Sequence, residues 1–196
     1  MARNKEFDRE EALKKALDVF WTKGYAAAST DDLLQAMQIG RQSMYDTFGD
    51  KRKLYLEALR RYNVDSIGEF LHNLRSQKDG SPLAGLQNAL YKFAGQPAAN
   101  HLRGCMGVNA VCEFGPDDAD VAQINEISGM SQSAALTHLI ADAKKQGELS
   151  ADIDEQSAAD FIAAILIGMK IKAKLGTSEA KLRHMSDIAI AGLKAM

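Results

Sequence analysis

The sequence has few cysteines, no long apolar run and almost no net charge, and each shortage excludes a class of protein. Only two of its 196 residues are cysteines, whereas a small secreted scaffold held by disulfides needs more. The longest apolar run, residues 161–169, falls short of the roughly 18–20 residues that a membrane span needs. The N-terminus lacks the apolar stretch of a signal peptide, so we expect a cytoplasmic protein without membrane partners.

The charges are distributed unevenly, although the formal net charge is only −2. Residues 39–62 carry six basic and three acidic side chains, whereas the residues from 63 onward carry 12 basic and 16 acidic ones. A mildly basic N-terminal region followed by an acidic remainder is typical of a DNA-binding module attached to another domain. Hydrophobic residues make up 46% of the chain, which is ordinary for a soluble globular protein and argues against disorder.

Apolar side chains recur at three- and four-residue steps along the chain, and this period predicts helices. No window shows the period of two that is typical of strands, and there is no internal repeat. Capping residues, glycines and prolines bound the expected helices. These cover residues 8–23, 29–37, 41–48, 50–74, 81–94, 102–114, 117–147, 154–176 and 177–195. The sequence therefore predicts an all-α fold of about nine helices.

The second and third expected helices are short, and the turn 37–40 joins them as in a helix-turn-helix. The third helix would enter the major groove of DNA. Arg41 and Gln42 stand at its N-terminus, where their side chains could bond guanine and adenine bidentately. Further side chains suited to phosphates are Ser43, Tyr45, Thr47 and Lys51. Pattern alone leaves a plain polar surface helix as the alternative.

Three segments in this region carry a more specific pattern, with constant spacing and no gap. They are ALDVFWTKGY at 16–25, STDDL at 29–33 and IGRQSMYDTFGDK at 39–51. Together they resemble the N-terminal signature of the tetracycline-repressor (TetR-type) family, over roughly residues 8–60. The resemblance implies a ligand-responsive regulator, a repressor, that forms a two-fold dimer on a pseudo-palindromic operator of double-stranded DNA and is released by a small-molecule effector.

Residue by residue, the resemblance assigns base reading to Arg41, Gln42 and Tyr45. It assigns phosphate binding to Ser29 or Thr30, Ser43, Tyr45, Thr47 and Lys51, and core positions to Met44 and Phe48. It implies a DNA-binding domain over residues 1–50, with a linking helix that runs to about 62. An effector-binding and dimerisation domain would follow over residues 51–196, and the homodimer would form mainly through the last two helices, about 155–195.

Three residues depart from the usual pattern of the family. Gln38 stands where the turn glycine is usual, so it could adopt a positive φ with some strain. Gly40 replaces a hydroxyl cap and is an acceptable N-cap. Asp46 is unusual on a face that meets DNA. It could accept from a cytosine amino group or, as we prefer, pair with Arg41 or Arg61 in the free protein.

The remaining helices offer candidates for an effector pocket and an interface. The expected helix 154–176 is apolar nearly all round, which is typical of a central helix or of one shared with a partner. Met and aromatic residues at helical spacing could line a pocket, although plain core packing is the alternative. The candidate residues are Phe70, Phe93, Cys105, Met106, Asn109, Met130 and His138.

Cys105 raises a second possibility, because the entry Arg103-Gly104-Cys105 resembles that of some electrophile-responsive TetR-type regulators. A helix N-terminus and a nearby cation favour a reactive thiolate, although most cysteines are inert core residues. A thiol enzyme is a competing hypothesis, but no base or orienting partner is evident, so we expect no enzyme. A further competing hypothesis is a helical adaptor protein that binds no DNA. No motif calls for a cofactor, and His101 with Cys105 makes no metal site.

Overall fold

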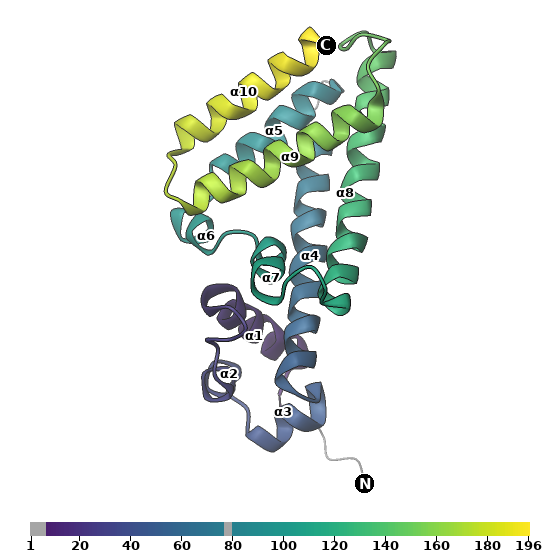
Figure 1. Ribbon diagram of the computed structural model, residues 1–196. Helices are drawn as coiled ribbons and strands as arrows, with labels where there is room; N and C mark the ends of the chain where they lie inside the picture. The colour runs from purple at the N-terminus through teal and green to yellow at the C-terminus, as the bar shows by residue number, and fades with distance from the viewer. Residues whose placement is uncertain (1–6, 77–79) are drawn as a thin grey trace. The chain divides into compact units, whose positions relative to one another are not determined.

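The computed structural model describes residues 7–76 and 80–196, which are helical and contain no β-strand. The predicted all-α class is confirmed. The helices in chain order (Figure 1) are α1 Arg9–Lys23, α2 Thr30–Met37, α3 Arg41–Phe48, α4 Lys51–Arg75, α5 Pro82–Ala94, α6 Ala98–Arg103, α7 Met106–Phe114, α8 Ala119–Lys145, α9 Glu155–Lys174 and α10 Glu179–Ala195. Within the described ranges, no helix has the length and apolarity of a membrane span.

The segment 102–114 is not the single helix that its pattern predicts. It is divided between α6 and α7, because Gly104 ends α6 with φ 72° and ψ −158°, outside the helical region. A Cβ at this position would lie 2.7 Å from Cδ of Lys174 on α9. The glycine therefore permits the positive φ and leaves room for the side chain of Lys174, and the described residues contain one helix more than predicted.

The helices form two compact units, and no single cut in the chain separates them. The first unit contains the described residues up to Val64 together with Met106–Asn125. The second contains the described residues of Asp65–Cys105 and of Glu126–Met196. Helices α4 and α8 each contribute residues to both units.

The core of the first unit joins α1, α2, α3 and the start of α4 to α7. Phe20, Leu33 and Met44 are almost fully buried in it, each at most 1% exposed. The ring of Phe20 meets Tyr55 edge to face at a centroid distance of 5.1 Å, and Tyr55 lies 5.2 Å from Phe114 of α7. These aromatic contacts attach α7, which is distant in sequence, to the first three helices.

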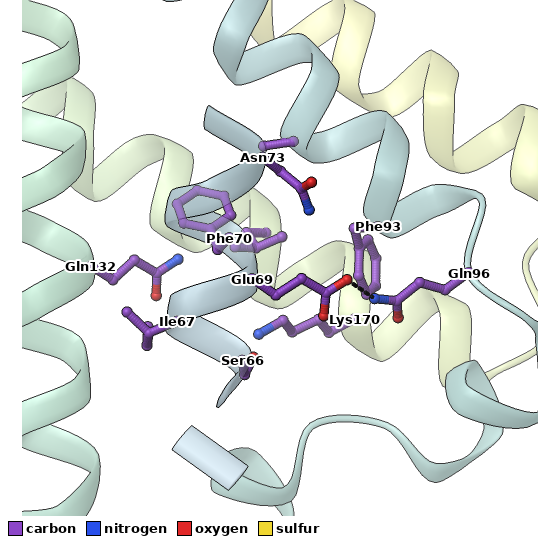
Figure 2. A pocket seen from close by; sticks show the side chains of 11 residues that line it. Ser66, Ile67, Glu69, Phe70, Asn73, Phe93, Gln96, Gln132 and Lys170 are labelled. Atoms are coloured by element: carbon purple, nitrogen blue, oxygen red, sulfur yellow. Dashed lines mark hydrogen bonds between the residues drawn. The ribbon is translucent and has the colours of Figure 1, made fainter. Parts of the chain in front are cut away.

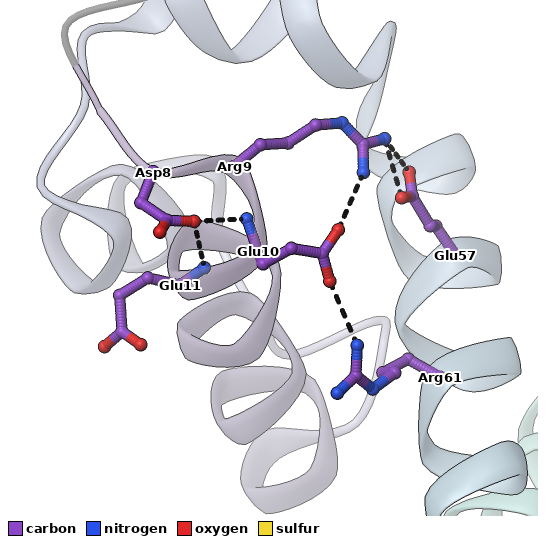
Figure 3. Close-up of polar contacts among 6 residues, drawn as sticks. All are labelled: Asp8, Arg9, Glu10, Glu11, Glu57 and Arg61. Carbon is purple, nitrogen blue, oxygen red and sulfur yellow. Dashed lines mark hydrogen bonds and ion pairs between the residues drawn. The ribbon is translucent and has the colours of Figure 1, made fainter.

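Ion pairs hold α1 against α4 on the outside of this core (Figure 3). Nη2 of Arg9 lies 2.6 Å from Oε1 of Glu57, and Nη1 of Arg61 lies 3.0 Å from Oε2 of Glu10. The side chain of Asp8 accepts from the amides of Glu10 and Glu11 and so caps the start of α1. Partly exposed pairs of this kind contribute little stability each, but they fix where α1 crosses α4.

The core of the second unit lies among α5, α8, α9 and α10. Leu86, Leu90, Leu136 and Ile162 are fully buried there. Gly85 of α5 allows a close approach to α4, because a Cβ on it would lie only 2.3 Å from the carbonyl oxygen of Leu74. The packing of the second unit therefore depends on a residue without a side chain.

Candidate nucleic-acid interface and ligand pocket

The turn between α2 and α3 has the backbone that its sequence predicts. Ser29 and Asp32 form a capping box at the start of α2. Gln38 ends α2 with φ 58° and ψ 39°, and it is the one non-glycine residue with positive φ in the described part of the chain. Gly40 is the N-cap of α3 without a side-chain bond. The predictions for Gln38 and Gly40 are both confirmed.

Helix α3 presents one buried face and one polar face. Met44 and Phe48 are 1% and 5% exposed, so the prediction that both are core residues is confirmed. Arg41, Gln42 and Tyr45 of the same helix are exposed, Arg41 because it stands in the first turn. The two buried side chains pack α3 against the core, and three side chains that can bond base edges or phosphates are exposed on it.

Carboxylates of the same unit already occupy two of these exposed donors. Arg41 Nη2 donates to Asp31 Oδ1 at 2.7 Å, and Gln42 Nε2 donates to Asp46 Oδ1 at 2.7 Å. The preferred ion pair of Asp46 with Arg41 or Arg61 is therefore wrong. Gln42 stands one helical turn before Asp46 and reaches it directly, whereas Arg41 reaches back to α2.

The start of α4 adds positive charge next to the recognition helix. Asp50 caps α4, with its carboxylate accepting from the amide of Lys53 at 2.8 Å. The Lys51 ammonium lies 4.4 Å from the centre of the Tyr25 ring, in cation–π geometry. Tyr45, Lys51 and Lys53 line the same open hollow, so residues from α3 and α4 meet on one surface.

Two further anchors connect this surface to the α7–α8 region within the first unit. Glu113 of α7 accepts from the amides of Tyr25 and Ala26, at 2.8 and 2.6 Å, directly after the end of α1. Arg52 donates to Asp118 at 2.8 Å and to Asp120 at 2.9 Å. The hydrogen bond from Arg52 lowers the pKa of Asp118, and its bonds to both carboxylates raise the pKa of Arg52. Sequence reasoning missed these anchors, because their partners lie more than 60 residues apart.

The remaining predicted DNA contacts lie close to these residues in the chain. Ser29 is exposed at the N-cap of α2, and Thr30, which begins that helix, is half-buried. Ser43 and Thr47 are half-buried on α3. All the predicted DNA-binding residues thus belong to the first unit, and the structure directly joins Tyr45 and Lys51 in one hollow.

A separate hollow of about 430 Å³, which includes its open mouth, lies within the second unit (Figure 2). Residues of α4, α5, α8 and α9 surround it. Its apolar wall consists of Ile67, Phe70, Ala89, Phe93 and Leu166. Its polar residues are Ser66, Glu69, Asn73, Gln96, Gln132 and Lys170. Apolar walls with a few polar groups are typical of small-molecule sites.

The seven candidate effector residues are not brought together around this hollow. Phe70 and Phe93 line it. Met106 and Asn109 belong to the first unit, where Met106 is 1% exposed in the core. Met130 is 66% exposed beside a different, shallow depression, and His138 is exposed on α8.

Cys105 lies next to a lining residue of the hollow. Its sulfur is 4.0 Å from Nζ of Lys170, and both Cys105 and Cys112 are free thiols. The cation beside this thiol thus comes from α9, whereas the sequence directed attention to Arg103 and His101. The sequence analysis did not predict Lys170 as a pocket residue. The feature that could have indicated it is a lysine directly after the apolar run 161–169.

Two short helices in a helix-turn-helix, an exposed polar recognition face and a second helical unit with a hollow define a helix-turn-helix transcriptional regulator. Comparison with known families specifies the family. Residues 12–58 match the profile described as bacterial regulatory proteins, tetR family, and residues 83–189 match the tetracyclin repressor-like C-terminal domain. The chain therefore belongs to the TetR family of transcriptional regulators, as its N-terminal signature indicated.

Relatives and solved structures agree with this assignment along the whole chain. The chain is 30% identical to the uncharacterized HTH-type transcriptional regulator YezE of Bacillus subtilis (strain 168), over 98% of this chain and 100% of that protein. It is 29% identical to the HTH-type transcriptional repressor ComR of Escherichia coli (strain K12), over 96% and 90%. A cysteine mutant of the TetR-family regulator CifR, complexed with 26-bp double-strand operator DNA, is 27% identical with a TM-score of 0.82, over 98% and 100%.

Proposed function

We propose that this protein is a dimeric repressor that binds a pseudo-palindromic operator and leaves it when a small molecule binds. The observation that carries the proposal is helix α3, in which Met44 and Phe48 are buried while Arg41, Gln42 and Tyr45 are exposed. The operator-bound state of CifR and the repressor role of ComR support it. The hollow of the second unit is the effector site in this proposal.

Each contact has a separate role in this proposal. Arg41 and Gln42 read base edges, since their side chains can bond guanine and adenine bidentately. Ser29 or Thr30, Ser43, Thr47 and Lys51 bind phosphates and position α3, and Tyr45 takes part in both. In this proposal residues 1–50 are the DNA-binding domain and residues 51–196 provide effector binding and dimerisation, although the compact first unit also contains residues 51–64 and 106–125.

The dimer in this proposal forms through α9 and α10. One side of α9 is buried in its own unit, but Ile167 and Ile171 on α9 are 47% and 46% exposed, and Ile188 on α10 is 60% exposed. Exposed branched apolar side chains one turn apart are typical of a helical interface. Ile167→Glu with Ile171→Glu should give a monomer by light scattering, with weaker operator binding. If Ile127→Glu on α8 gives the monomer instead, the proposed interface is wrong.

Selection of bound fragments from a random DNA pool tests the proposal directly. The wild-type protein should enrich a sequence with two inverted half-sites. Tyr45→Ala combined with Lys51→Ala should abolish this enrichment without changing the helical circular dichroism spectrum. In a plot of the logarithm of the binding constant against the logarithm of the salt concentration, the steepness of the slope should also fall by about one unit for each phosphate that the variant no longer binds. Lys92→Ala, an exposed lysine of the second unit, is the matched control and should bind as the wild type does. If no sequence is enriched at any salt concentration, the proposal fails.

A further inference from the structure

The hollow of the second unit contains a cation without an anionic partner. Lys170 reaches it from α9 and is half-buried (Figure 2). Among the described residues, no carboxylate lies within ion-pair distance of its ammonium, whose polar neighbour is the sulfur of Cys105 at 4.0 Å. A thiol is a weak acceptor and does not compensate the positive charge. Partial removal of an ammonium from water is unfavourable unless an anion accompanies it.

Two amide side chains in the same hollow also lack partners within the chain as described. Asn73 on α4 and Gln132 on α8 are half-buried, and neither carboxamide forms a hydrogen bond with another described residue. Gln96, by contrast, donates to Glu69 at 3.4 Å. Carboxamides that line a hollow and bond nothing in the protein are available to orient a bound molecule.

The two aromatic rings determine the shape of the apolar side of the hollow. Phe70 comes from α4 and Phe93 from α5, and Leu166 of α9, only 4% exposed, completes the wall between them. Rings and a branched aliphatic side chain favour a flat or branched apolar group. Glu69 is the anionic residue of the lining, but it is exposed to water and already accepts from Gln96, so its charge is screened.

We propose that the hollow binds a small carboxylic acid with an aromatic or branched apolar body. The carboxylate pairs with Lys170, the body lies against Phe70 and Phe93, and Asn73 and Gln132 bond its remaining polar atoms. This inference rests on the proposed function only for the consequence of binding, which is release from DNA. Binding itself depends on the hollow alone.

Calorimetry on the full-length protein with three probes that share a benzyl group tests the charge preference. Phenylacetate is negative, phenylacetamide is neutral and phenethylamine is positive. Phenylacetate should bind about tenfold or more tightly than phenylacetamide, because its carboxylate forms an ion pair with the Lys170 ammonium, whereas the amide offers that ammonium only an uncharged carbonyl oxygen. Phenethylamine should bind most weakly. Equal binding of the acid and the amide, preference for the amine, or no binding by any probe would each overturn the proposal.

Variants of the cation identify the group responsible. Lys170→Met should remove the preference for phenylacetate over phenylacetamide, and Lys170→Arg should restore most of it. Lys172→Met is the matched control, because Lys172 is exposed on the same helix. Phe93→Ala should weaken the acid and the amide equally. If Lys170→Met keeps the preference, Lys170 is not the recognition group and the proposal is wrong.

A DNA-binding measurement on the same samples separates this inference from the proposed function. If the protein binds an operator but phenylacetate gives neither heat nor release, only the inference fails. If phenylacetate binds through Lys170 but no DNA sequence is selected, the inference holds and the proposed function fails.

Discussion

The recognition surface of the first unit and the hollow of the second are built in opposite ways. The residues that we assign to DNA lie between 29 and 51, within two helices and their flanks. The hollow takes residues from four helices between 66 and 170. Arg41 and Gln42 are already bonded to carboxylates of their own unit, whereas Lys170 has no such partner among the described residues. The donors of the first surface thus already have partners in the protein, whereas in our proposal the cation of the second gains an anion that it lacks.

The largest expected effect concerns the close packing of α5 against α4 in the second unit, to which the hollow belongs. Gly85→Ala places a Cβ 2.3 Å from the backbone oxygen of Leu74, which cannot move aside as a flexible side chain could. We expect a loss of about 1–3 kcal/mol in the free energy of unfolding, typical of overpacking, measured by urea denaturation. Gly68→Ala on α4 is the control, since a Cβ there meets nothing within 4 Å. It should stabilise the protein by up to about 1 kcal/mol. Equal effects of the two substitutions would contradict this account.

Substitution of Glu113 tests whether the contacts of α7 stabilise the first unit. Glu113→Ala removes the acceptor of the Tyr25 and Ala26 amides. We expect hydrogen exchange at these two amides to accelerate and the free energy of unfolding to fall by about 1 kcal/mol, because the bonds are exposed. Gln123→Ala, an exposed residue of the same unit, should change neither quantity. If hydrogen exchange at the two amides is unchanged, their hydrogen bonds to Glu113 are absent in solution.

Substitution of Asp46 tests whether its hydrogen bond with Gln42 helps Gln42 to read a base. Asp46→Asn retains an oxygen that can accept from Gln42, whereas Asp46→Ala removes it. Both variants should bind random DNA more tightly, because a negative charge near phosphates is removed. Asp46→Ala alone should reduce discrimination at one base pair, by up to about tenfold, since Gln42 is no longer oriented. Competition with operators changed at single positions measures this. Unchanged discrimination in Asp46→Ala would show that Asp46 does not orient Gln42, and an equal loss in both variants would show that the acceptor oxygen alone is not enough.

The smallest effect is a pH dependence at the capping box of α2. Hydrogen bonds from Lys23 and Ser29 lower the pKa of Asp32 from 3.8 to about 2. A lowered pKa in the folded state means that this contribution is complete above pH 3.8, the unfolded value, and disappears as the pH falls through about 2. The difference in unfolding free energy between the wild type and Asp32→Asn should be small, because the site is exposed, and should shrink between about pH 4 and pH 2. A constant difference over this range would show that the carboxylate charge is not involved.

Local features of the first unit could be predicted because they depend on residues close in the chain. The capping box of Ser29 and the burial of Met44 and Phe48 depend on spacings of three or four residues. The positive φ of Gln38 was expected from the resemblance to the family, because Gln38 stands at the position of the usual turn glycine. The expected pairing of Asp46 was wrong, because charge alone does not decide between several nearby donors. The continuous helix over 102–114 was wrong because Gly104 adopts a positive φ outside the helical region and ends α6.

The sequence by itself determined the all-helical class, the helix-turn-helix and the TetR-family signature, since each depends on side-chain period or on fixed spacing. Only the tertiary structure decided which distant residues meet. In the first unit, α7 packs against the other helices through Glu113 and Phe114. In the second unit, Lys170 lies with Phe70 and Phe93 around one hollow. Such contacts depend on how helices cross, which is set by the shapes of buried side chains and by glycines such as Gly85.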